Sequence, residues 1–227
     1  MAASNTENDF CNVNVSSLAL LRRFSHLEVT MGINQAIDYF VNIGLDSRII
    51  AFLKNSPEEL FPQKWDEKLM DNKANPFPSS WENLGHMITN LQAPKNGSDK
   101  SYLDSIFHLA ASCVGAPVGS KFVDFCRMVD KLDMEEILRE PKKNIDKINQ
   151  SQDRASLLYA VIFSIGHRWI RADKKVTPAK VIEIAQNLPA EFGTSFVQHT
   201  LSSRSNKLAQ EKGFEKLLTK FGKYFDV

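Results

Sequence analysis

Apolar residues recur at helical spacing along almost the whole chain beyond about residue 30. In the clearest case, Phe122, Phe125, Cys126 and Val129 follow the i, i+3, i+4, i+7 pattern that places side chains on one face of a helix. The same spacing recurs in five other segments, residues 33–41, 81–91, 103–110, 158–169 and 214–225. Each stripe predicts a helix with one buried face.

Helix start and stop signals accompany several of these stripes. Ser79, with Glu82 three residues later, has the pattern of a capping box ahead of the helix at residues 81–91. Thr177 followed by Pro178 predicts a cap and a first-turn proline at the start of another helix. Gly44 is typical of a residue just beyond a helix C-terminus.

Strand-like alternation is confined to residues 24–29, and no later segment has the pattern of a sheet. The sequence therefore predicts a mostly α protein with one short N-terminal strand. Polar or proline-rich breaks fall at residues 61–78, 93–99 and 139–153, and the last is the strongest candidate for an internal boundary. We expect three regions, residues 1–30, 31–140 and 141–227.

Composition narrows the class of protein. The 227 residues are 43% hydrophobic, with 28 basic and 27 acidic side chains, so no overall field attracts nucleic acid or an anionic membrane. The longest apolar run, residues 157–165, is far shorter than the roughly 20 residues that span a bilayer. Three widely spaced cysteines favour a reducing compartment. We expect a cytoplasmic protein that binds neither nucleic acid nor membrane.

Most catalytic motifs are absent from the sequence. It contains no GxSxG, HExxH, EF-hand or GxGxxG pattern, and none of its five histidines has the spacing of a metal ligand. The segment at 115–121, GAPVGSK, has three residues between its glycines where a phosphate-binding loop has four, which favours a tight helix junction. The pairs Glu58-Glu59 and Glu135-Glu136 are expected on solvated faces, because adjacent helical positions point about 100° apart.

The order of segments nevertheless resembles a known family. The N-terminal residues SSLALLRRFSHLEV (16–29) are similar to the end of the core of MoxR-type AAA+ ATPases, and the resemblance extends over nearly the whole chain. The later segments that carry it are GLDSRIIAFLKNSPEELF (44–61), FPSSWENLGHMI (77–88), CVGAPVGSKFVDFCRMV (113–129), ILREP (137–141) and LPAEFGTSFVQHTL (188–201).

This resemblance implies roles for particular residues. Asn5 corresponds to the sensor 1 asparagine, and Arg23, followed by Phe24, corresponds to the arginine finger that stabilises charge on the γ-phosphate bound to a neighbouring subunit. The alternative without a catalytic role is that Arg22 and Arg23 are an ordinary basic pair on the surface. Ser79 stands where the family often has a sensor 2-like arginine.

The function implied by the resemblance is that of a helical lid in an ATP-driven machine. The sequence contains neither a P-loop nor a Walker B acid, so we expect the chain alone neither to bind nor to hydrolyse ATP. In an intact protein, ATP and Mg²⁺ would be cofactors, the partners would be a complete ATPase core or neighbouring subunits in a ring, and an unknown client protein would be remodelled. The alternative is a stand-alone helical interaction module, marked by an exposed apolar patch near residues 61–77 or on the last helix.

Overall fold

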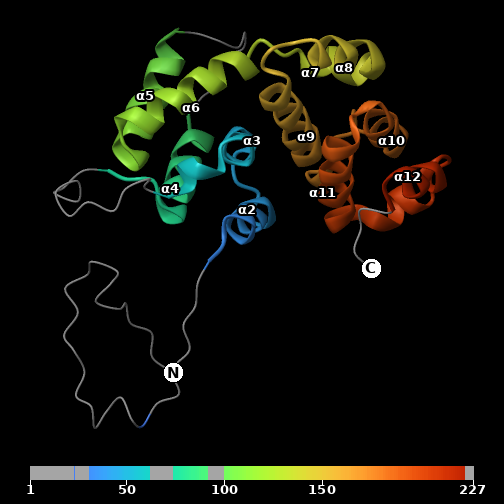
Figure 1. Ribbon diagram of the computed structural model, residues 1–227, viewed down its shortest axis with the longest axis horizontal. Helices are drawn as coiled ribbons and strands as arrows, with labels where there is room; N and C mark the ends of the chain where they lie inside the picture. The colour runs from blue at the N-terminus through green and yellow to red at the C-terminus, as the bar shows by residue number, and fades with distance from the viewer. Residues whose placement is uncertain (1–22, 24–30, 62–73, 92–99, 223–227) are drawn as a thin grey trace.

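Eleven α-helices and one short 3-10 helix, with no strand, make up the described part of the chain in the computed structural model (Figure 1). The structure describes residues 23, 31–61, 74–91 and 100–222, and for residues 202–206 it describes the helix but not the side chains. The predicted mostly α fold class is confirmed for these residues. The predicted strand at residues 24–29 lies outside them.

The helices follow one another with short connections. Their bounds are α2 Ile33–Asn42, α3 Ser47–Asn55, η2 Pro57–Leu60, α4 Pro78–Thr89, α5 Lys100–Val114, α6 Ala116–Val129, α7 Met134–Arg139, α8 Pro141–Asn149, α9 Arg154–Ile170, α10 Pro178–Asn187, α11 Ala190–Ala209 and α12 Phe214–Phe221. Figure 1 shows α4, α5 and α6 on one side of the molecule and α10, α11 and α12 on the other, with α2, α3 and α9 between them. Helix α3 packs on both α6 and α9, and thereby joins the two sides.

The predicted stripes form most of the core. All four residues of the α6 stripe are buried, as are Leu158, Val161, Ile162, Ile165 and Trp169 of α9. The aromatic rings of Phe52, Trp81 and Phe122 meet with centroid separations of 5.5–5.7 Å, which joins α3, α4 and α6. Each buried indole has a main-chain acceptor: Trp81 donates to Glu59 at 3.0 Å and Trp169 to Thr200 at 3.2 Å.

The α5–α6 hairpin is unusually close because of two glycines. Gly115 connects the helices with φ of +88°, in the left-handed region that favours glycine. At Gly119, an added Cβ would lie 3.0 Å from the main-chain nitrogen of Ala111 on α5. The predicted tight junction is confirmed, and the segment is a packing device between two helices.

Two helix-end predictions are confirmed and one is wrong. The Thr177 hydroxyl caps α10 by accepting from the main-chain nitrogen of Lys180, and Gly44 follows α2 with φ of +67°. Ser79, however, is not a cap, because α4 already begins at Pro78 with an extended Phe77 before it and no side-chain cap. A proline is best placed in the first turn, so the helix starts ahead of the serine.

Residues 139–153 were expected to form a break, and this expectation is also wrong. Their centre is helix α8, whose residues Ile145 and Ile148 are buried and which packs on α9 and α10. Two apolar residues at i, i+3 are enough to hold a short helix against its neighbours even when most other positions are polar. The division of the chain at residue 140 stays a prediction.

Candidate functional site

Of the two site residues implied by the resemblance, the structure describes only Arg23. Arg23 is exposed and lies in a turn, whereas Asn5 and Arg22 lie outside the described residues. An exposed arginine is compatible both with a finger that reaches a neighbouring subunit and with an ordinary surface charge. The role of Arg23 therefore stays a prediction.

Several large apolar side chains on and beside helix α2 are exposed to solvent. Met31, Ile33, Tyr39 and Ile43 are all exposed, and they are four of the six large apolar side chains that are exposed among the described residues. We call these four residues the α2 surface. Ile33 opens the same helical stripe as Ile37 and Phe40, which are buried. The apolar stripe of α2 therefore extends, at its N-terminal end, beyond the helices that bury Ile37 and Phe40.

Polar contacts fix the edge of this surface against α4. The hydroxyl of Tyr39 donates to Glu82 Oε1 at 3.1 Å, and this hydrogen bond raises the pKa of the tyrosine. His86, one turn further along α4, lies 3.7 Å from the same carboxylate oxygen. An exposed hydrogen bond thus links α2 to α4.

The apolar patch expected near residues 61–77 or on the last helix stays a prediction, because part of each segment lies outside the described residues. Phe61 is half-buried, residues 62–73 lie outside the described part, and α12 exposes only Leu218 among its large apolar side chains. Phe221 of α12 packs against Gly193 of α11, where an added Cβ would lie 2.4 Å from the ring. The described part of the last helix is accordingly a packed element.

A buried polar centre joins α3 to its neighbours. Arg48 binds Asp46 in a two-pronged ion pair, Nη2 to Oδ2 at 2.8 Å and Nε to Oδ1 at 3.0 Å, and both side chains are largely buried, at 17% and 14% exposed. Asp46 also caps α3 by accepting from the main-chain nitrogen of Arg48. The remaining Nη1 of Arg48 donates to the Tyr102 hydroxyl of α5 at 3.2 Å.

Burial and pairing act in opposite directions on this pair. Burial alone would raise the pKa of Asp46, but the hydrogen bonds and charge of Arg48 outweigh it and the pKa is lowered. The pKa of Arg48 is raised by the same hydrogen bonds and charge against its own burial. Both groups are therefore charged at neutral pH. Nearby, burial raises the pKa of the Cys126 thiol to about 12, so this cysteine is an inert core residue.

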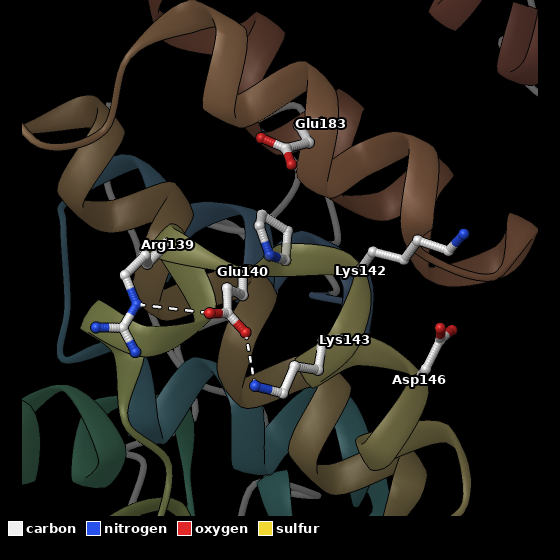
Figure 2. Close-up of a pocket in the computed structure, with 7 residues that line it drawn as sticks. Arg139, Glu140, Lys142, Lys143, Asp146 and Glu183 are labelled. Atoms are coloured by element: carbon white, nitrogen blue, oxygen red, sulfur yellow. Dashed lines mark hydrogen bonds and ion pairs between the residues drawn. The ribbon is translucent and has the colours of Figure 1, made fainter.

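An open hollow lies between α8 and α10. It encloses about 500 Å³ and is lined by Arg139, Glu140, Pro141, Lys142, Lys143, Asp146 and Glu183 (Figure 2). Glu140 pairs with Lys143 at 2.7 Å and lies 4.0 Å from Arg139. Positive and negative side chains are equal in number here, so the hollow has no net charge with which to select an anion or a cation.

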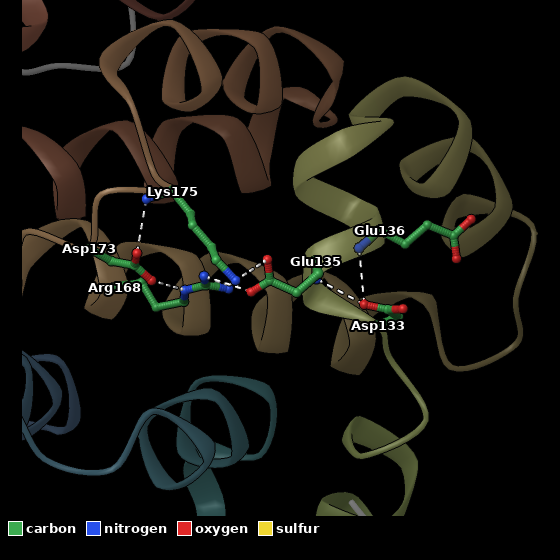
Figure 3. A network of polar contacts seen from close by, with 6 residues as sticks. All are labelled: Asp133, Glu135, Glu136, Arg168, Asp173 and Lys175. Carbon is green, nitrogen blue, oxygen red and sulfur yellow. Dashed lines mark hydrogen bonds and ion pairs between the residues drawn. The ribbon is translucent and has the colours of Figure 1, made fainter. Parts of the chain in front are cut away.

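A network of charged groups ties α7 to the loop after α9 (Figure 3). Glu135 accepts from Arg168 at 2.8 Å and from Lys175 at 3.0 Å, and Arg168 also pairs with Asp173 at 2.7 Å. Asp133 caps α7 through the main-chain nitrogens of Glu135 and Glu136. The side chains of Asp133, Glu135, Arg168, Asp173 and Lys175 all have partners within the protein, which indicates a structural role for this network.

The sequence interpretation missed one buried charge. Glu59 was expected on a solvated face but is only 3% exposed, and its carboxylate pairs with Lys121 of α6. Its neighbour Leu60 is fully buried, and the 3-10 turn of η2 carries Glu59 inward beside it. The sequence pair Glu58-Glu59 does not indicate that Glu59 is buried, because its partner Lys121 lies in a distant part of the chain.

Comparisons with known protein families, with curated proteins and with solved structures find no match to this chain. Among the described residues, no three or more histidine, cysteine, aspartate or glutamate side chains gather in a way that could hold a metal ion. No helix in this part of the chain has the length and apolar character needed to cross a bilayer.

Proposed function

We propose that the chain is the C-terminal, lid-bearing part of a MoxR-type AAA+ ATPase, followed by a further helical tail. The observation that carries this proposal is the α2 surface. Ile37 and Phe40 of the α2 stripe are buried, whereas Ile33 and the preceding Met31 remain exposed. An apolar stripe that continues past its packing partners favours a further body that covers its front end.

The chain itself suggests which body this is. Met31 directly follows residues 1–30, which by the resemblance are the end of an ATPase core. A core joined there would stand at the N-terminal end of α2. The occupant of the α2 surface is therefore the α/β core of the same protein, and ATP-driven movement of the lid against that core would remodel a client protein.

The described residues do not fit ATP by themselves. At the position where the family often has a sensor 2-like arginine, Ser79 is an exposed residue of α4 and brings no positive charge to a phosphate. The P-loop and the Walker B acid, which would hold the phosphates and Mg²⁺, are not in the sequence. The one group offered for catalysis is Arg23, which would act on nucleotide bound by a neighbouring subunit.

The proposal is tested first at the gene and then by ATP turnover. An in-frame P-loop and Walker B segment are expected upstream of the codon for Met1, and a stop codon or unrelated sequence there would contradict the proposal. In a protein that carries this segment, Arg23→Ala is expected to lower turnover by about 10³-fold or more, as for other arginine fingers. Arg22→Ala is the matched control and is expected to change turnover by less than about tenfold, the difference made by roughly 1.4 kcal/mol.

The 227-residue chain alone supplies a second arm of the test. It is expected to show no ATP turnover above that of the buffer. Turnover that persists in the purified chain and is lost in Arg23→Ala would overturn the proposal that the nucleotide site lies elsewhere.

A stand-alone helical interaction module is the second candidate, because the α2 surface could equally bind another copy of this chain. Sedimentation distinguishes the two. The module requires association that rises with concentration and is lost when Ile33 and Ile43 are replaced by serine. A strictly monomeric chain counts against the module and leaves the lid as the better proposal.

A further inference from the structure

Two side chains on α4 have a spacing that suits metal ligands. Glu82 and His86 are four residues apart on this helix, so both project from one face, one turn from each other. The same i, i+4 spacing lets two histidines on one helix hold zinc in metalloproteases. The sequence interpretation assigned no metal-ligand spacing to any histidine and missed this pair. The side chains of Glu82 and His86 are 31% and 65% exposed, so an ion can reach them from solvent.

The distance between the two ligand atoms is too long for a hydrogen bond and close to the distance that a shared metal ion sets. Nε2 of His86 lies 3.7 Å from Oε1 of Glu82. Zinc binds imidazole nitrogen at about 2.0–2.1 Å and carboxylate oxygen at about 2.0–2.2 Å, so two such ligands in tetrahedral geometry are about 3.4 Å apart. A small rotation of the exposed imidazole would therefore bring both atoms onto one ion.

A residue of another helix orients the carboxylate. The hydroxyl of Tyr39, on α2, donates to Oε1 of Glu82 at 3.1 Å. Metal-binding carboxylates are in turn hydrogen-bonded by outer residues, and a carboxylate that accepts one hydrogen bond has lone pairs left for an ion. Because this bond comes from α2, it restricts the directions in which the glutamate can turn away from His86. Tyr39 is thus a positioning residue.

The mixed donor set indicates which ions fit. Imidazole nitrogen suits Zn²⁺, Cu²⁺ and Ni²⁺, whereas Mg²⁺ and Ca²⁺ take oxygen ligands. One imidazole and one carboxylate therefore favour a divalent first-row transition-metal ion. The described residues supply no third histidine, cysteine, aspartate or glutamate here, so water would occupy the remaining coordination positions. With two protein ligands, the ion is expected to exchange with solvent.

We propose that Glu82 and His86 form a binding site for a divalent transition-metal ion, with the carboxylate of Glu82 and Nε2 of His86 as ligands and Tyr39 as the residue that orients the carboxylate. This site does not depend on the proposed lid function, because it uses neither nucleotide nor residues 1–30. The ion binds the neutral imidazole, so it competes with the proton for His86.

The test is a titration of the full chain with Zn²⁺, followed by NMR of the histidine side chains, with Mg²⁺ as the comparison ion. We expect a saturable change in the imidazole signals of His86 with Zn²⁺, and binding of Mg²⁺ that is at least about tenfold weaker. The signals report each imidazole separately, so zinc bound at a cysteine or at another histidine is distinguished from zinc at this site. No saturable change at His86, or equal effects of the two ions, would overturn the proposal. This comparison uses the unaltered protein and so cannot fail through misfolding.

Two variants then separate the second ligand from the positioning residue, with the His86 signals as the readout in both. Glu82→Gln is expected to weaken zinc binding by at least about tenfold, and Tyr39→Phe by about tenfold, the smaller effect of losing an outer hydrogen bond. Glu215→Gln, at an exposed position of α12, is the control and should leave the affinity unchanged. Unchanged affinity in Glu82→Gln would show that His86 binds zinc alone and would overturn the site. Unchanged affinity in Tyr39→Phe would overturn the role given to the tyrosine.

Discussion

Glu59 and Lys121, 62 positions apart in the chain, form an ion pair in which the carboxylate is buried and the lysine side chain is largely exposed. The pair joins η2 to α6 at the edge of the aromatic cluster of Phe52, Trp81 and Phe122. A buried carboxylate depends on its partner far more than an exposed ammonium does, because only the carboxylate has lost its hydration.

The first prediction follows from this asymmetry. Lys121→Ala is expected to lower the free energy of unfolding more than Glu59→Gln does, because the first leaves a buried charge unmatched while the second removes that charge. Urea denaturation of both variants measures the difference. Lys131→Ala, an exposed residue just after α6, is the control and should leave the midpoint where it was. A midpoint for Lys121→Ala equal to that control would show that water already satisfies Glu59.

The second prediction concerns the polar centre. Arg48→Met is expected to destabilise the protein by about 3–5 kcal/mol, because it leaves the buried Asp46 carboxylate without its counter-charge. Arg127→Met is the matched control: its pair with Asp124 is exposed, and such pairs contribute about 0–1 kcal/mol. Thermal unfolding of the two variants gives the comparison. Equal losses would mean that Asp46 finds another donor.

The third prediction tests the contact between α9 and α11. Gly166→Ala would place a Cβ 2.1 Å from Cδ2 of His199, so we expect a net loss of about 1–3 kcal/mol from overpacking. Gly222→Ala has no atom within 4 Å of the new Cβ and should be nearly neutral. Denaturant midpoints of the two variants decide the matter. A neutral Gly166→Ala would mean that the imidazole ring can move aside.

The fourth prediction is a pH dependence. Burial lowers the pKa of His199 from 6.5 to about 4, so the folded protein keeps this imidazole neutral in a range where the unfolded chain protonates it. Unfolding therefore takes up a proton, and stability falls as the pH is lowered. For this one group the loss between pH 7 and pH 5 is about 2 kcal/mol.

Replacing the histidine isolates its contribution. His199→Gln should flatten the decline of the unfolding free energy between pH 7 and pH 5, whereas His108→Gln, at an exposed position, should retain it. The half-buried His167 acts in the same direction, because its pKa is also lowered, so a smaller decline remains in the first variant. An unchanged decline in His199→Gln would contradict the assignment.

The sequence predicts local features well where one periodic signal dominates. The prediction of α6 depended only on the spacing of four apolar residues, and each of these residues is buried as expected. The predicted break at residues 139–153 was wrong because the polar composition of this segment was given more weight than its two buried apolar positions, Ile145 and Ile148. The predicted cap at Ser79 was wrong because Pro78, a competing helix-start signal, lies one residue ahead of it.

The candidate sites were harder to foresee because they depend on residues that are distant in sequence. Asp46 and Arg48 are two positions apart, yet nothing in that spacing shows that Tyr102 and Asp130 come to lie around them. Glu59 was misplaced for the same reason, since Lys121 belongs to another helix. The exposure of Ile33 follows from where the packing partners of α2 end, which periodicity does not report.

The glycine contact between α5 and α6 has a mechanical consequence. At Gly119 the two backbones approach so closely that no side chain separates them, and Gly115 leaves almost no slack in the connection. Such a hairpin behaves as one stiff lever, because sliding or twisting one helix against the other would drive main chain into main chain. A force applied to this hairpin would therefore pass to the helices packed against it and would not be absorbed between α5 and α6.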